Sequence, residues 1–145
     1  MTRILAVDPG LTTGACVIDA WVDDFRVVAC LEIPWAHAPR LLTALYDGTF
    51  ISQDEPQLPD VVVCETFRLR QARALQQVGS EFEAVQVIGM LRMLLYPQLL
   101  VPQEPSMMSR VQILPRDEEW TQGSEHRGDA YKHARYYFVT QVLKV

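Results

Sequence analysis

The sequence predicts an α/β fold in which a mixed five-stranded sheet is flanked by helices. Apolar runs typical of strands occur first as a group of three and then singly, and stretches with a helical period follow them. The chain has 145 residues, which is enough for one domain with a substantial core and too few for two ordinary domains. We therefore expect a single domain over residues 1–145, with the element order β-β-β-α-β-α-β-α.

The first three strands are predicted to form an antiparallel meander. They cover residues 3–8, 14–21 and 25–33. The first run is almost entirely apolar, as is typical of a central strand. Pro9 and Gly10 indicate a tight turn after it, because proline presets one backbone dihedral and glycine permits positive values. A second turn is predicted at Asp23 and Asp24.

The rest of the chain alternates between helices and strands. Ser80 followed by Glu83 is a capping box, which predicts the start of an apolar helix that stops near Pro97. Prolines punctuate the region after it, and residues 47–60 indicate a surface loop. Helices are predicted at 39–46, 82–95, 107–111 and 125–143, and strands at 61–65 and 99–101.

Composition limits the class of protein. Hydrophobic content of 49% and charged content of 21% are typical of a soluble globular protein. The sequence shows no signal pattern and no apolar run near 18 residues, so we expect a cytosolic protein with no membrane contact. The three cysteines lie in apolar runs without CxxC spacing and are expected to be buried thiols.

The net charge of −5 argues against a protein that coats nucleic acid, which would usually be basic. It is compatible with a metal-dependent nuclease, because bound divalent cations offset the negative charge of an acidic site.

Two buried strands each end in a carboxylate. Asp8 closes the first strand and Glu65 closes the fourth, and sites in open α/β sheets lie outside the carboxyl ends of strands. His126 and Asp129 are three residues apart in the last predicted helix and therefore share one face of it. An Asp before Pro-Gly is by itself most often a turn residue. The combination is more specific, and its donors suit Mg²⁺ or Mn²⁺.

The pattern resembles the RuvC-type Holliday junction resolvases of the RNase H-like superfamily, especially their phage-encoded relatives. The resemblance runs from residue 4 to about residue 138. It is carried by a first strand that ends in D-P-G, an acid that closes the fourth strand, and a D/H-x-x-D-A motif in the last helix. The matching residues are Asp8, Pro9, Gly10, Glu65, His126, Asp129 and Ala130.

This resemblance implies an RNase H-like fold, a homodimer and metal-dependent nicking of branched DNA in recombination and repair. It implies that Asp8, Glu65, His126 and Asp129 are both the catalytic residues and the ligands of two Mg²⁺ or Mn²⁺ ions, which such sites hold about 3.5–4 Å apart. Asp8 would bridge the ions. Asp129 and His126 would hold the ion that activates water, and Glu65 would hold the ion on the leaving-group side. A phage origin would place the protein in the host cytoplasm.

A basic stretch follows the fourth strand directly and is expected to contact DNA. Its arginines suit the planar recognition of phosphate. They are Arg68, Arg70 and Arg73. Phe67 is expected either to stack on an unpaired base or to belong to the core. Lys132 is expected to contact phosphate or to be solvated.

Two further features have alternative interpretations. His133 lies seven residues after His126, and we expect a partly buried structural histidine, with support of the site as the alternative. The apolar helix that begins near Phe82 would be covered either by the core or by a second subunit.

Three rival functions share some of these residues. The nearest is an RNase H-like nuclease of the YqgF kind that acts on RNA and also opens with D-P-G. An actin-like ATPase could use residues 8–14 as a phosphate loop, although such proteins need a second domain. The third is a catalytically idle interaction module, against which the presence of all four candidate ligands argues.

Overall fold

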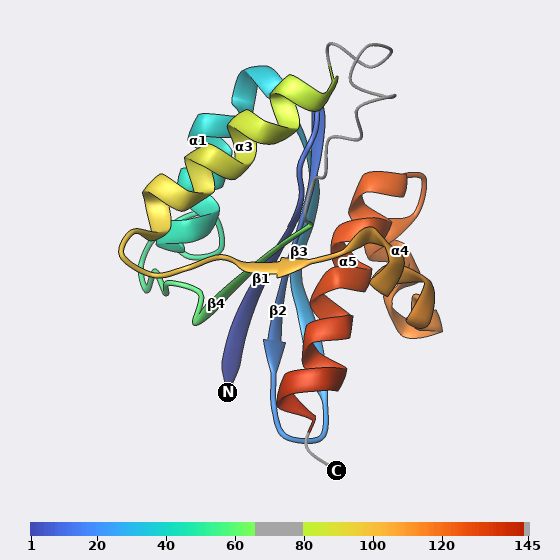
Figure 1. Ribbon diagram of the computed structural model, residues 1–145. Helices are drawn as coiled ribbons and strands as arrows, with labels where there is room; N and C mark the ends of the chain where they lie inside the picture. Colours follow the sequence, from blue (N-terminus) through green and yellow to red (C-terminus); the bar gives the residue numbers. More distant parts are fainter. Residues whose placement is uncertain (66–79, 144–145) are drawn as a thin grey trace.

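The computed structural model describes residues 1–65 and 80–143 (Figure 1). A five-stranded sheet forms the middle layer. Helices α1 (Ala38–Asp47) and α3 (Ser80–Leu95) cover one face of the sheet, and α5 (Glu125–Tyr137) covers the other. No helix in the described ranges is long and apolar enough to cross a membrane.

The sheet is mixed, as predicted, and its strand order is β3-β2-β1-β4-β5. The first three strands pair antiparallel, whereas β4 runs parallel to β1 and β5 runs parallel to β4. The strands are β1 (Thr2–Asp8), β2 (Thr12–Ala20), β3 (Phe25–Pro34), β4 (Val61–Glu65) and β5 (Val101–Gln103). The central position of β1 follows from its apolar character, since it is covered on both faces.

The second strand begins two residues earlier than predicted, at Thr12, and three further elements differ more clearly. The last strand lies two residues later than expected and includes Pro102, which is tolerated because β5 is an edge strand. The helix expected at 107–111 is a 3₁₀ helix at Pro105–Arg110. The last helix is α-helical only to Tyr137 and continues as a π-helix over Phe138–Val142.

The remaining short elements were not predicted. They lie before α1 and before α5. They are 3₁₀ turns at Trp35–His37 and Pro115–Asp117 and the one-turn helix α4 (Glu118–Thr121).

Two hydrophobic clusters cover the two faces of the sheet. Leu5 and Val7 of β1 point toward α1 and α3, whereas Ile4 and Ala6 point toward α5. Side chains alternate between faces along a strand, so Asp8 belongs to the α5 face. The alternation along β1 therefore puts Asp8 on the same face as α5, as the expected site requires.

The cysteines of the described residues are free thiols, as predicted. Cys16 and Cys64 are buried and Cys30 is half-buried. Burial raises the pKa of Cys64 to about 12, and the neighbouring charges of Asp8 and Glu65 act in the same direction. This thiol therefore stays neutral and packs as a small apolar side chain.

The end of β1 opposite Asp8 carries a buried ion pair. Arg3 donates from Nε and a terminal guanidinium nitrogen to both carboxylate oxygens of Asp19, at 2.7 and 2.9 Å. Asp60 accepts from the backbone N–H of Arg3 at 2.7 Å and donates its own N–H to the Arg3 carbonyl at 2.9 Å. Acid and base are therefore paired at this end of the strand.

Candidate active site

Strand register places Asp8 and Glu65 side by side. Val7 pairs with Cys64 in the parallel β1–β4 ladder, so the next residue of each strand is an acid. Both acids terminate their strands, and the side chains of Asp8 and Glu65 are 13% and 20% exposed. The two carboxylates predicted from the strand ends are therefore neighbours, half-buried at the carboxyl edge of the sheet.

Helix α5 brings the third acid and a histidine to this edge. His126 lies in its first turn, with Nδ1 3.5 Å from Asp8 Oδ2. Asp129 follows three residues later and interacts electrostatically with both Asp8 and Glu65. All four predicted ligands thus come from β1, β4 and α5 to one place, although Asp8 is more buried than its position at a strand end suggested.

Gly14 allows α5 to approach the sheet this closely. It is the register partner of Asp8 in β2. A Cβ atom at this position would collide with the backbone of His126, with the carbonyl carbon only 2.5 Å away. The N-terminus of α5 is also fixed by Ser124, whose hydroxyl accepts from the Arg127 N–H at 3.1 Å and donates to Glu32 of β3.

Burial, followed by the crowding of acids, determines the electrostatics of the site. Burial raises the pKa of Asp8 to about 8, and the charges of Glu65 and Asp129 add to the shift. Burial also raises the pKa of Asp129, with Glu65 acting in the same direction and Lys132 opposing it. Like charges in a partly desolvated site favour a proton or a cation between them.

Two buried side chains, one behind the other, support Glu65. His133 is fully buried, and its Nε2 lies 3.0 Å from Glu65 Oε2. Its Nδ1 lies 2.7 Å from Gln103 Oε1, and Gln103 is only 4% exposed. His133 was expected to be partly buried and structural, and Gln103 was not predicted at all. Its place as the register partner of Glu65 is visible only in the structure, since the strand predicted at 99–101 did not include it.

The donor set fits a hard divalent cation. The structure contains three carboxylates and one imidazole at the edge of the sheet, and carboxylate oxygens are the ligands that Mg²⁺ and Mn²⁺ prefer. Within residues 1–65 and 80–143, however, no three His, Cys, Asp or Glu side chains are arranged to hold a metal ion. The acids are electrostatic neighbours rather than a closed ligand set, and the raised pKa of Asp8 is the observation that favours a cation here.

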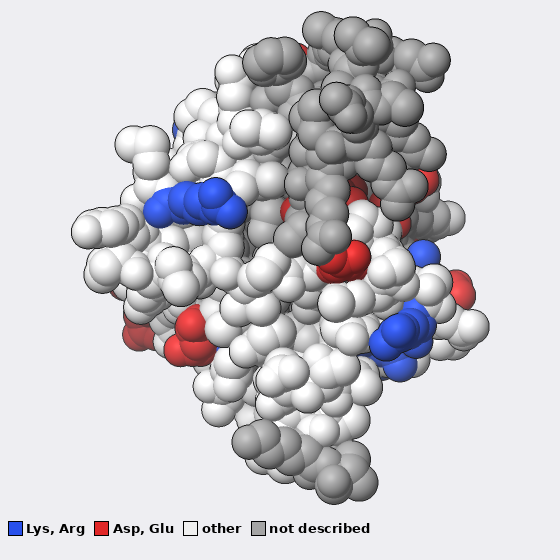
Figure 2. Space-filling model, viewed as in Figure 1, with Lys and Arg blue, Asp and Glu red and all other residues white. Residues whose placement is uncertain are grey.

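The predicted DNA contacts are placed only in part. Phe67, Arg68, Arg70 and Arg73 lie outside the described residues. Lys132 is half-buried, and its charge acts on Asp129. On the face shown in Figure 2, basic side chains of the described residues form small separate patches. A contact between Lys132 and DNA stays a prediction.

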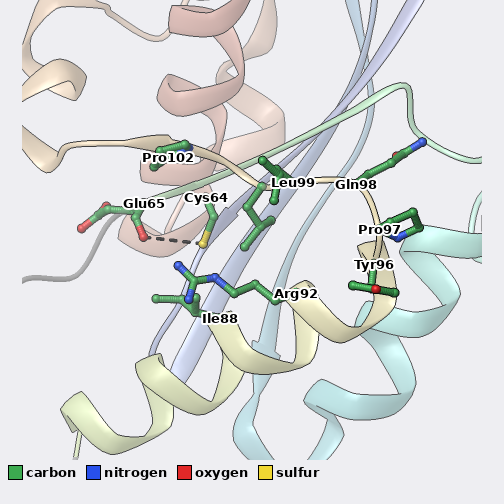
Figure 3. A pocket seen from close by; sticks show the side chains of 10 residues that line it. Cys64, Glu65, Ile88, Arg92, Tyr96, Pro97, Gln98, Leu99 and Pro102 are labelled. Atoms are coloured by element: carbon green, nitrogen blue, oxygen red, sulfur yellow. Dashed lines mark hydrogen bonds between the residues drawn. The ribbon is translucent and has the colours of Figure 1, made fainter.

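A cavity of about 580 Å³ lies on the other face of β4 (Figure 3). Ile88 and Arg92 of α3 form one wall, and Tyr96 and Leu99 lie on the segment that follows the helix. Cys64 lines the cavity, and its thiol donates to the Glu65 carbonyl at 3.5 Å. The cavity therefore reaches the backbone of Glu65, whereas the carboxylate belongs to the α5 face.

Stability should depend on pH through Asp8. Its pKa is about 8 in the folded state against 3.8 for a free side chain, so folding favours the protonated form. This stabilisation is complete below pH 4 and is lost as the pH rises toward and through 8. Between pH 5 and 8.5, without divalent ions, we expect the wild type to lose about 4 kcal/mol relative to Asp8→Asn, which corresponds to roughly ten degrees in Tm. Thermal unfolding of both proteins across this range measures the difference. Equal pH profiles would contradict it.

The strand order, with an antiparallel meander followed by two parallel strands and helices on both faces, defines an RNase H-like fold. Within this fold, the chain is similar to RuvC and to a poxvirus resolvase. Thermus thermophilus RuvC, solved with a Holliday junction substrate, matches at 11% identity and a TM-score of 0.64, covering 94% of this chain and 93% of that one. The Fowlpox virus resolvase, solved with Holliday junction DNA, matches at 11% identity and a TM-score of 0.58, covering 96% and 98% of the two chains. No family model and no curated protein sequence matches.

Proposed function

We propose that the protein is a metal-dependent, structure-specific endodeoxyribonuclease that cuts Holliday junctions or other branched DNA. The observation that carries the proposal is the meeting of Asp8, Glu65 and Asp129 from three separate elements at the carboxyl edge of the sheet. Two of the similar proteins were solved with junction DNA, and the likeness covers nearly the whole chain. Both lines of support are independent of the net charge.

In this proposal, Asp8, Glu65, Asp129 and His126 hold the Mg²⁺ or Mn²⁺ ions. Bound there, the ions would supply a hydroxide nucleophile and stabilise the leaving oxygen of a phosphodiester. Asp8 is the central ligand, because its carboxylate is the one that interacts with Glu65, Asp129 and His126. Lys132, next to Asp129, would offset part of the acid charge as the DNA backbone approaches.

The test is one cleavage assay with labelled four-way, three-way, flap and linear DNA, each with Mg²⁺ and with Mn²⁺. We expect nicking of branched DNA and little cutting of the linear duplex. A structured RNA and ATP are included as further substrates. Cleavage of RNA in preference to all DNA forms would favour the YqgF-like alternative. Hydrolysis of ATP without nuclease activity would contradict the proposal.

We further propose that the protein is a homodimer. The buried side of α3 packs on the sheet through Val87 and Leu91. Apolar side chains also face solvent on this helix and on the segment beside the cavity of Figure 3. They are Val85, Met93, Tyr96 and Leu99, which are 50%, 82%, 83% and 87% exposed. Exposed apolar side chains grouped in this way are typical of an interface.

A charged side chain introduced at this surface should prevent the two subunits from associating. We expect Met93→Glu to convert a dimer to a monomer, because an interface would have to bury the new carboxylate. Val22→Glu is the matched control, since Val22 is 70% exposed in the turn between β2 and β3. Sedimentation velocity of both variants measures the mass. A wild-type monomer, or equal behaviour of the two variants, would contradict this interface.

A further inference from the structure

Of the three acids, Glu65 has the longest side chain, so the backbone fixes its carboxylate least. It is the last residue of β4, and its carboxylate stands at the end of a flexible side chain. The charge of Asp129 repels it, which favours rotation of the side chain toward solvent. Ordering such a side chain also has an entropic cost. Another group must therefore hold the Glu65 carboxylate if it is to act in the site.

Besides Asp8, with which it shares a side-chain hydrogen bond, the Glu65 carboxylate is contacted by His133. Its Nε2 lies 3.0 Å from Glu65 Oε2, and the imidazole has no exposed surface. The same carboxylate also interacts with Asp8, through a side-chain hydrogen bond and through charge. The bond from His133 thus holds one oxygen of a carboxylate that also contacts Asp8.

Gln103 in turn fixes the imidazole. Its Oε1 lies 2.7 Å from His133 Nδ1, and it is the register partner of Glu65 across the β4–β5 ladder. The chain Gln103–His133–Glu65 therefore joins β5, α5 and β4. A buried ring with both nitrogens bonded has one orientation, since rotation would leave buried polar atoms without partners.

We propose that His133 and Gln103 are positioning residues, which hold the Glu65 carboxylate in the orientation needed to bind a divalent cation. Hydrogen bonds to a ligating side chain fix its direction, and their loss typically lowers metal affinity about 10- to 100-fold. The inference rests on the proposed function only in assigning Glu65 as a metal ligand. It makes no assumption about the DNA that is cut.

Two substitutions test the two ring nitrogens of His133 separately, because each introduces a side-chain amide of different reach. The amide of Gln in His133→Gln reaches the place of Nε2, and the amide of Asn in His133→Asn reaches only the place of Nδ1. We expect His133→Gln to keep Mn²⁺ affinity within about 3-fold of the wild type, and His133→Asn to lose about 10- to 100-fold. Calorimetry and the Mn²⁺ EPR signal measure this binding without DNA.

Tyr131→Phe is the control that separates a loss of Mn²⁺ affinity from a general loss of stability. Tyr131 is a fully buried neighbour on α5, and its hydroxyl donates to Asp117 at 2.6 Å. This variant should lower Tm and leave Mn²⁺ affinity unchanged, because its lost bond lies outside the acid cluster. Equal Mn²⁺ affinity in the wild type and His133→Asn would overturn the inference. So would a loss of affinity in all three variants that follows their loss in Tm.

The cleavage assay keeps the two proposals apart. A wild type that binds Mn²⁺, responds to the His133 variants as expected and cuts no nucleic acid would refute the nuclease but support the positioning role. If the wild type and His133→Asn cut branched DNA equally well and bind Mn²⁺ with equal affinity, the nuclease proposal is supported and the positioning role is overturned.

Discussion

Replacing Asp8 with Asn is expected to reduce DNA cleavage by at least about 1000-fold and to leave junction binding intact. Cations at such sites contribute several kcal/mol to stabilisation of the transition state, and each 1.4 kcal/mol is tenfold in rate. Asp8 is the acid at which the interactions of Glu65, Asp129 and His126 meet, so its loss removes the central ligand. Binding should persist, because removing an acid reduces repulsion of the DNA backbone.

The variant should also remain folded, since the neutral amide relieves the crowding that raises the pKa of Asp8. Single-turnover cleavage, junction binding in Ca²⁺ and thermal unfolding are measured on the same preparations. Asp23→Asn, which removes an exposed acid in the turn between β2 and β3, is the charge-matched control and should cut normally. Wild-type nicking by Asp8→Asn would remove the basis of the active-site assignment.

Gly14→Ala is expected to lower both activity and stability, although it adds a single methyl group. The new Cβ would collide with the backbone of His126, which unlike a flexible side chain cannot rotate away. Helix α5 would have to move away from β2 and carry His126 and Asp129 with it. Overpacking of this kind costs about 1–3 kcal/mol, and a displacement of about 1 Å at a reacting centre can cost 100-fold in rate.

Gly89→Ala supplies the comparison. A Cβ at Gly89 on α3 meets no atom within 4 Å, and alanine is the better helix former by about 1 kcal/mol. We expect this variant to be as stable as the wild type or more stable, with unchanged cleavage. Thermal unfolding and cleavage rates of the two glycine variants test the difference. A Gly14→Ala protein with wild-type rate and Tm would show that α5 does not need its close approach to the sheet.

The strands and most helices could be predicted from the sequence because their signals are local. The run 61–65 has a boundary at each end and was predicted at its observed limits. The strand near Val101 was misplaced, because Pro102 was taken as a terminator although an edge strand accepts it. The helix expected at 107–111 was wrong in type, since i→i+3 geometry over so few residues leaves no distinct period.

The acids of the site could be predicted because each ends a legible strand or lies at helical spacing. Their closeness could not, since it depends on the register between β1 and β4. The Gln103–His133 contact depends on the register of β5 and on how α5 lies across the sheet. The role of Gly14 depends on the same docking of α5. Such contacts between distant segments have no local pattern.

The position of α5 along the chain has a consequence for biosynthesis. All five strands precede this helix, which brings His126 and Asp129 to Asp8 and Glu65 (Figure 1). A chain emerging from the ribosome can therefore assemble its sheet while two of the four candidate ligands are still missing. Nuclease competence would then arise late in synthesis, when docking of α5 completes the cluster.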